Sequence, residues 1–328
     1  MVGRATSFVL SAALAILVGC QPVAYKIVPV PLDKDLEETV VGGSRRAADK
    51  VAVVDVSGLL VDEYRRGLLV EGENPVALLQ ENLDRAAEDR RVRAVVVRIN
   101  SPGGTVTASD LMYLQIRSFR EHTSKPVVAV LMDVSASGGY YVACACDYIV
   151  AHPTTVTGSI GVMMQTFSLA GTMQKLGIRA DAIKSGPYKD AGSLLRDLKQ
   201  TERDVFQKLI DEFHERFVQV VDTGRPGLSA EQIEKLADGR VYSGKQAHEL
   251  GLVDQLGTLA NAVTAACERA GVAEARVVRY HRPDAWRPNV YAGAPSGAPT
   301  TVNLVSLQLG DWPAWCGPRF LYLWSPGL

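Results

Sequence analysis

The chain has 328 residues, of which 47% are hydrophobic and 22% are charged, and its 35 basic and 36 acidic side chains leave a formal net charge of −1. This length and apolar content suit one large domain or two average ones, and they exclude a disordered or collagen-like chain. Because the charge is balanced and no long run of like charges occurs, the chain lacks the basic surface that nucleic-acid binding requires. Five cysteines without metal-ligand spacing predict neither a disulfide scaffold nor a metal site, and we expect no cofactor.

The N-terminus has the pattern of a secretory signal. Arg4 precedes an apolar stretch over residues 8–18, which is shorter than the ~20 residues of a membrane-spanning helix. The sequence LVGC at 17–20 is similar to the bacterial lipobox, in which the signal is removed and the cysteine is acylated. We therefore expect cleavage after residue 19 and a lipid anchor on Cys20. The body would then be held at a membrane of the cell envelope outside the cytoplasm, on the periplasmic side in a two-membrane bacterium. An uncleaved anchor or a buried helix is the alternative.

Residues 20–49 are polar and contain several prolines and a Gly-Gly-Ser breaker, which predicts a tether. An ordered domain is expected from residue 50 to residue 272. It begins with a β-branched, almost continuously apolar stretch at 51–60, typical of a buried strand, and a helix follows from Pro75. Strands are then predicted at 94–99, 126–131 and 148–151, and helices at 109–121 and 138–144. This alternation with short connections predicts an α/β fold with a parallel sheet flanked by helices.

The segments further along the chain are less regular. We expect helices near 169–176, 202–221, 230–237 and 244–250, and a strand near 180–184. Residues 273–328 form an aromatic, proline-rich tail that contains all four tryptophans. Such aromatic density is unusual for a linker, so the tail is predicted to pack over the groove of the domain or against a neighbouring protomer. Membrane contact and disorder are the alternatives.

Two glycine loops follow predicted strands, NSPGG at residues 100–104 and SASGG at residues 135–139. The carboxyl ends of parallel strands meet at one edge of a sheet, which brings the two loops together. Ser137 lies at a strand-to-helix turn, where its hydroxyl could act as a nucleophile. The amide of Gly138, with that of Gly103 or Gly104, could hold an oxyanion. A tight turn with a helix cap is the ordinary alternative.

The base that would activate this serine is the weakest part of the pattern. None of the five histidines lies in a loop suited to a triad. A lysine can serve when it is neutral, which requires burial or a nearby cation. Lys189 follows a rigid, partly apolar Gly-Pro-Tyr sequence, and Lys184 is the fallback. Asp190 would keep such an amine charged, so we expect Asp190 to point away from Lys189.

Taken together, these loops resemble the signal peptide peptidase A family, membrane-associated bacterial serine peptidases with a Ser-Lys dyad, in its short lipoprotein form. The resemblance spans about residues 51–270 and follows the family's order. The matching segments are RINSPGG at 98–104, SASGGYY at 135–141, TGSIGV at 157–162, SGPYKD at 185–190 and GRVYSGKQA at 239–247.

The resemblance implies a role for each matching residue. Ser137 becomes the nucleophile, Lys189 the general base, and Gly104 and Gly138 the oxyanion donors. Ser159 lies where such enzymes often place a hydroxyl that orients the lysine.

Four residues of the nucleophile helix and its end are expected to be structural. Tyr140 and Tyr141 are predicted to pack this helix, with a role in a substrate pocket as the alternative. Cys144 and Cys146 are predicted to be small buried hydrophobic residues, although a disulfide is conceivable for an exported chain.

The resemblance also implies the ClpP/crotonase-like spiral fold, a homo-oligomeric, dome-like ring with sites near protomer contacts, and hydrolysis of hydrophobic peptides such as remnant signal peptides through an acyl-enzyme. A crotonase-like enzyme acting on a thioester is one alternative, which export disfavours because coenzyme A esters are cytoplasmic. An inactive peptide-binding scaffold is the other, which the intact Ser137 and Lys189 disfavour.

Overall fold

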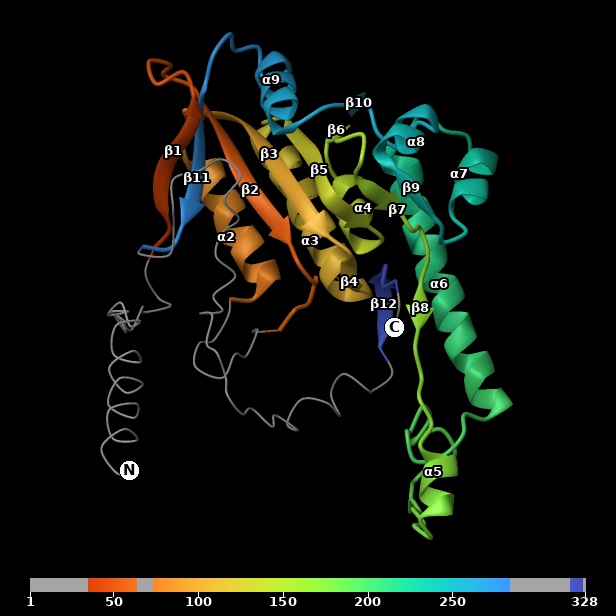
Figure 1. Cartoon of the computed structure of the whole chain (residues 1–328). Coiled ribbons are helices and arrows are strands. Elements are labelled where there is room, and N and C mark those ends of the chain that lie inside the picture. Colours follow the sequence, from red (N-terminus) through yellow and green to blue (C-terminus); the bar gives the residue numbers. More distant parts are fainter. Residues whose placement is uncertain (1–34, 64–72, 284–318, 327–328) are drawn as a thin grey trace, which may run out of the picture. The chain divides into compact units, whose positions relative to one another are not determined.

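The structure, a computed structural model, describes residues 35–63, 73–283 and 319–326, and from Leu36 onward they belong to one unit. Its centre is a sheet in the order β1-β11-β2-β3-β5-β6-β10, parallel throughout except for the pair β1 and β11 (Figure 1). β7 extends β5 in parallel and pairs antiparallel with β9. The strands are β1 (Glu37–Gly43), β2 (Lys50–Ser57), β3 (Val92–Ser101), β5 (Val127–Ala136), β6 (Tyr148–Ala151), β7 (Val156–Gly158), β9 (Val241–Ser243), β10 (Gln255–Leu256) and β11 (Arg276–His281).

Helices lie on both faces of this sheet. All but α9 occur where the sequence predicts them, with ends that differ by a few residues. The first begins as its sequence dictates, because the Asn74 side chain accepts from the amides of Val76 and Ala77 and Pro75 occupies the first turn. The helices are α2 (Pro75–Glu88), α3 (Val106–Thr123), α4 (Gly138–Ala143), α5 (Ala170–Lys175), α6 (Gln200–Gly224), α7 (Ala230–Leu236), α8 (Gly244–Glu249) and α9 (Leu259–Arg269). In the described part of the chain, none is long and apolar enough to cross a membrane.

Two hydrophobic cores lie on opposite faces of the sheet because side chains alternate along each strand. In β2, Ala52, Val54 and Val56 belong to the core with α2, α3 and α4, whereas Val51 and Val53 belong to the core with α9. A strand covered on both faces is apolar throughout, which explains the continuous apolar run at its start. The predicted α/β fold with a parallel sheet flanked by helices is confirmed. The closer likeness to the ClpP/crotonase spiral stays a prediction.

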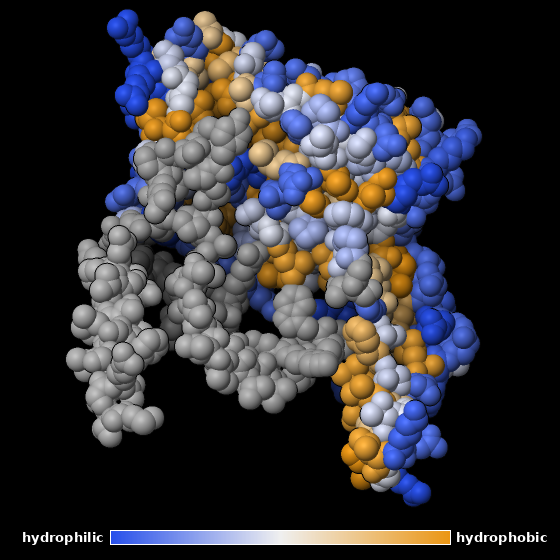
Figure 2. Space-filling model, viewed as in Figure 1, coloured by the Kyte–Doolittle hydropathy of each residue, from blue (hydrophilic) through white to orange (hydrophobic). Residues whose placement is uncertain are grey.

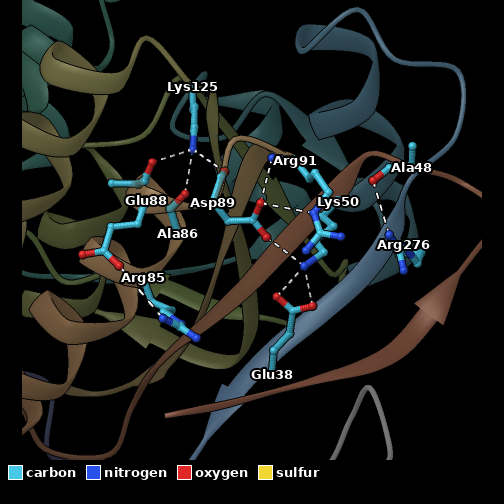
Figure 3. A network of polar contacts seen from close by, with 11 residues as sticks. Glu38, Ala48, Lys50, Arg85, Ala86, Glu88, Asp89, Arg91, Lys125 and Arg276 are labelled. Atoms are coloured by element: carbon cyan, nitrogen blue, oxygen red, sulfur yellow. Dashed lines mark hydrogen bonds and ion pairs between the residues drawn. The ribbon is translucent and has the colours of Figure 1, made fainter. Parts of the chain in front are cut away.

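A buried lysine connects the N-terminal strand to the sheet (Figure 3). The Lys50 side chain is 3% exposed, and its amine donates to both carboxylate oxygens of Glu38 in β1 (2.5 and 2.7 Å) and to Asp89 after α2 (2.8 Å). Burial acts to raise the pKa of Asp89, but hydrogen bonds from Lys50 and a backbone amide outweigh it and lower the pKa to about 2. The Lys125 amine donates to three carbonyl oxygens at the end of α2.

The structure corrects both predicted ends of the domain. Within the expected tether at 20–49, residues Glu37–Gly43 form β1, which pairs with β11. β11 is parallel to β2, so the sheet also extends beyond the predicted last residue, 272. The expectation was wrong for these residues because β1 is an edge strand whose partner lies near the other end of the domain, and a local hydrophobic pattern does not record such a contact. The predicted signal at 1–19 and Cys20 lie outside the described residues.

A projection extends from the unit, carried by β8 (Met163–Met164) and the first part of α6, with α5 at its end (Figure 1). The strand predicted near 180–184 is absent; these residues are irregular and exposed, and no described strand pairs with them. Of the eleven large hydrophobic side chains exposed in the described part, eight lie between Phe167 and Val205, and Figure 2 shows hydrophobic residues along this projection. Such a concentration indicates a contact surface.

The described end of the tail forms β12 (Phe320–Leu323). It is the central strand of a second sheet, antiparallel to β4 (Gly103–Thr105) on one side and to β8 on the other (Figure 1). These four residues of the tail therefore pack against the domain, next to the first glycine loop. Packing of the tail over a groove or against a neighbouring protomer stays a prediction. Three of the four tryptophans lie outside the described residues.

Candidate active site

Ser137 joins β5 to α4 in a strained turn. Its φ of 52° and ψ of −117° lie outside the regions that residues with a side chain favour. Its amide donates to the Gly158 carbonyl at 2.8 Å, and its carbonyl accepts from the Tyr141 amide at 2.9 Å. The residue is 1% exposed, and its hydroxyl does not cap α4. The alternative of an ordinary capped turn is therefore disfavoured, and the geometry is that of a nucleophile held at a sharp strand-to-helix turn.

The two glycine loops meet beside Ser137, as the sheet topology predicts. A Cβ at Gly103 would lie 2.7 Å from the amide nitrogen of Gly138, so this approach requires a glycine. The Gly103 amide donates to the Ser101 hydroxyl at 3.0 Å. Gly104 is paired with Tyr322 of the neighbouring strand β12. The structure thus brings the first glycine loop to Gly138, and the role of Gly104 as an oxyanion donor stays a prediction.

Ser159 lies beside Ser137. β5 and β7 are parallel with Ala136 opposite Gly158, so the two serines are the next residues of paired strands. Ser159 is buried, also has a positive φ (51°), and its amide donates to the Arg240 carbonyl at 2.7 Å. The role of its hydroxyl in orienting the lysine stays a prediction.

The residues that follow Ser137 are structural, as predicted. Tyr140 and Tyr141 are fully buried; the Tyr140 hydroxyl donates to the Leu252 carbonyl at 2.7 Å and the Tyr141 hydroxyl to Asp110 at 2.5 Å. Burial and the Asp110 carboxylate raise the pKa of Tyr141 well above its usual range, so its phenol stays protonated and a donor.

The cysteines at the end of α4 are inert for the same reason. Cys144 and Cys146 are buried and free, and burial raises the pKa of Cys144 to about 12. The prediction that both are small buried residues is therefore confirmed. A thiol that stays protonated in an apolar site is also a poor nucleophile.

Lys189 is not brought to Ser137 within the described chain. It is exposed, in the segment between α5 and α6 at the end of the projection, whereas α4 lies against the sheet (Figure 1). The Asp190 carboxylate accepts from Arg196 and forms an ion pair with Lys184. Hydrogen bonds from Arg196 and Lys184 hold the pKa of Asp190 well below its usual range. Asp190 therefore turns to these partners, as expected, and the fallback base Lys184 is engaged in an ion pair.

One residue of the site was not singled out from the sequence. Tyr322 in β12 is fully buried, with its ring centroid 4.8 Å from that of Phe217 and 5.0 Å from that of Tyr141. The only signal for it is the apolar run Phe320–Leu323 near the C-terminus, which does not say what it contacts.

A buried serine in a strained turn, flanked by glycine amides at the carboxyl edge of a parallel sheet, is an arrangement for acyl transfer, the chemistry of serine hydrolases. Residues 120–273 match peptidase family S49. A Synechocystis protein named as a candidate protease is 40% identical over 223 residues, which cover 68% of this chain and 75% of that protein. An Enterococcus faecium protein named as a candidate signal peptide peptidase SppA is 32% identical over 244 residues, covering 74% and 70%.

The chloroplastic serine protease SPPA of Arabidopsis thaliana is 34% identical over 250 residues, covering 75% of this chain but 36% of the plant protein. A solved structure of a mutant of the 1510-N membrane-bound stomatin-specific protease has a TM-score of 0.44 at 14% identity, covering 67% of this chain and 85% of the other. These similarities in sequence show that the chain belongs to peptidase family S49, together with the signal peptide peptidases of the SppA type. The chain is therefore a serine peptidase.

Proposed function

We propose that this peptidase hydrolyses hydrophobic peptides, such as remnant signal peptides, with Ser137 as nucleophile and Lys189 as general base. The Ser137 oxygen attacks the peptide carbonyl carbon while its proton passes to the lysine amine, and the departing amine of the substrate takes that proton. The amides of Gly104 and Gly138 hold the oxyanion, Ser159 orients the lysine, and water releases the acyl group. The observation that carries this proposal is the strained, uncapped Ser137 in the second glycine loop, beside the first.

The lysine of each site comes from a neighbouring chain in this proposal. Ser137 is buried at the sheet edge, whereas Lys189 is exposed on a projection that also carries most of the exposed large hydrophobic side chains of the described part. A head-to-tail ring in which each projection covers the next chain would bury these apolar side chains and bring Lys189 to Ser137 of the neighbour.

Anchoring at a membrane is a separate part of the proposal. The LVGC sequence at 17–20 supports removal of residues 1–19 and acylation of Cys20, and an enzyme tethered in this way would meet hydrophobic peptides where they leave a membrane. Incorporation of labelled palmitate into the chain in a bacterial host, with Cys20→Ala as the control, tests it. Labelling that survives in Cys20→Ala would refute the lipid anchor.

Hydrolysis of a fluorogenic hydrophobic peptide tests the dyad. We expect Ser137→Ala and Lys189→Ala each to abolish turnover with the oligomer unchanged, while Lys175→Ala, an exposed lysine of the same projection, keeps full activity. Near-normal activity of Lys189→Ala would show that another group is the base.

Mixing the two inactive variants tests whether the dyad is shared between chains. In a ring assembled at random from equal amounts of Ser137→Ala and Lys189→Ala chains, half the chains keep the serine and half of their neighbours keep the lysine. About one quarter of the sites should then regain activity after dissociation and reassembly. A dyad within one chain predicts no recovery, as does an enzyme that works as a monomer.

A further inference from the structure

Arg196 lies at the centre of a polar network in the segment that carries Lys189. Its Nε and Nη2 atoms donate to the two carboxylate oxygens of Asp190 at 2.9 and 2.7 Å. Its Nη1 and Nη2 atoms donate to the two carboxylate oxygens of Glu202 at 2.9 and 2.6 Å. One planar guanidinium therefore holds two carboxylates by paired hydrogen bonds, a geometry that a lysine cannot reproduce.

The same guanidinium also holds the backbone of the segment. Nη2 donates to the Asp190 carbonyl at 3.0 Å, and Nη1 donates to the Asp197 carbonyl at 3.1 Å. On the other side of Lys189, the chain makes a turn in which the Lys189 amide donates to the Gly186 carbonyl at 3.2 Å. Lys189 therefore lies between this turn and a residue whose carboxylate and carbonyl are both bound by Arg196.

The Glu202 end of the network is fixed to the body of the protein. The Glu202 side chain is 1% exposed, and its Oε2 also accepts from the Lys199 amide at 3.1 Å, in the first turn of α6. α6 continues for 25 residues, and near its other end Phe217 and Val221 belong to the hydrophobic core that also contains residues of α4. Arg196 thus joins the lysine segment to a long helix that is anchored in the core (Figure 1).

The network also determines what the Asp190 carboxylate contacts. A carboxylate close to an amine favours the charged form of the amine, and a charged amine cannot take a proton from a serine. Arg196 and Lys184 bind the Asp190 carboxylate instead, and their hydrogen bonds hold its pKa well below the usual range. The other charged groups at the network in the described part of the chain are Glu202, whose pKa is lowered by its hydrogen bonds from Arg196, and Lys199 at the start of α6.

We propose that Arg196 is a positioning residue of the peptidase, which fixes the segment that presents Lys189 and keeps the Asp190 carboxylate away from the lysine amine. The lysine is carried on a projection, so its placement at a serine depends on how firmly the segment is held. A misplacement of about 1 Å in a catalytic group can lower the rate about 100-fold. This proposal rests on the proposed function, since it takes Lys189 as the general base.

The first test compares kcat and KM for a fluorogenic hydrophobic peptide from about pH 6 to about pH 10, the range in which a perturbed lysine titrates. We expect Arg196→Ala to lower kcat at least about tenfold with KM changed less than about twofold, and to shift the rise of activity about one pH unit upward. Arg196→Lys keeps the charge but loses the paired hydrogen bonds, so its kcat should lie between the two. Arg203→Ala, which removes an exposed arginine of the same helix, is the control and should leave kcat and the pH profile unchanged.

A double variant separates the two parts of the proposed role. In the Arg196→Ala, Asp190→Asn chain the carboxylate is absent, so the pH profile should return to that of the wild type. The segment is still not held by Arg196, so kcat should stay low. An arginine that only stabilises the fold predicts one pH profile for all of these variants.

Acetylation of the lysine gives a readout that does not depend on which group is the base. Assembled Ser137→Ala chains, with and without Arg196→Ala, are treated with a limiting amount of acetic anhydride. The acetylation of Lys189 is measured by mass spectrometry relative to Lys175, an exposed lysine of the same projection. Because only a neutral amine reacts, we expect Arg196→Ala to lower this ratio about tenfold for a shift of one pH unit, and Asp190→Asn to restore it.

Each outcome decides one of the two proposals. If Arg196→Ala keeps the pH profile and the acetylation ratio of the parent chain while Lys189→Ala abolishes turnover, the role of Arg196 is overturned and the dyad stands. Activity that persists in Lys189→Ala overturns the proposed function, and the acetylation ratio then still decides whether Arg196 keeps Asp190 from the lysine. If Arg196→Ala does not assemble, Arg196→Lys is measured in the same way.

Discussion

Replacing the nucleophile by glycine should stabilise the protein while abolishing its activity. Ser137 has φ 52° and ψ −117°, a conformation that glycine adopts freely and a residue with a Cβ does not. Ser137→Gly and Ser137→Ala both remove the hydroxyl, but only glycine relieves the backbone strain. The comparison of these two variants therefore isolates the strain from the loss of the side chain.

The size of the effect follows from two opposing contributions. Holding a non-glycine residue in such a region costs about 1–3 kcal/mol, and glycine loses about 0.5–1 kcal/mol through the entropy of the unfolded chain. The free energy of unfolding of Ser137→Gly should thus exceed that of Ser137→Ala by about 1–2 kcal/mol. In a domain of this size each kcal/mol raises Tm by about 2–4 °C, so we expect a difference of about 2–8 °C.

Thermal unfolding followed by calorimetry, at equal protein concentration, measures this difference. Ser124→Gly is the matched control, because Ser124 also has a positive φ (55°) but ends α3 away from the site. That variant should gain stability and keep full activity. A Ser137→Gly chain that melts at or below the temperature of Ser137→Ala would refute the assignment of strain to the nucleophile turn.

Three further predictions concern the fold around the site. The folded pKa of Asp89 is about 2 against an ordinary 3.8, so its pairing with Lys50 stabilises the fold above pH 4, and this stabilisation is lost as the pH falls from about 4 to 2. After allowance for solvent screening, the free energy of unfolding should fall by about 1 kcal/mol over this pH interval, and Asp89→Asn should lack this fall. Gly103→Ala places a Cβ 1.9 Å from the Tyr322 carbonyl oxygen and 2.7 Å from the Gly138 amide nitrogen, so kcat/KM should fall at least about 100-fold in the peptide assay. Normal activity would contradict the proposed oxyanion hole beside Ser137. The buried thiol of Cys144, whose pKa is raised to about 12, should resist iodoacetamide at pH 8 in the folded chain and react after unfolding, as read by mass spectrometry.

The sequence determined what depends on neighbouring residues. The buried strands at the start of β2, β3 and β5 were visible as apolar runs, and the helix start at Pro75 was visible from its cap and proline. The position of Ser137 at a strand-to-helix turn, with the glycine loops at the same sheet edge, followed from the βα alternation, because the topology of a parallel sheet gathers the carboxyl ends of its strands.

The tertiary structure decided what depends on residues far apart in the chain. The pairing of β1 with β11 and the placement of β12 between β4 and β8 join segments near the two ends of the chain to its centre, and no local pattern encodes such partners. The close approach of Gly103 to the Gly138 amide, and the hydrogen bond from the Gly103 amide to Ser101, were also visible only in the fold. The separation of Lys189 from Ser137 was also invisible in the motifs, because a motif fixes the order of residues along the chain and not the distance that the fold sets between them.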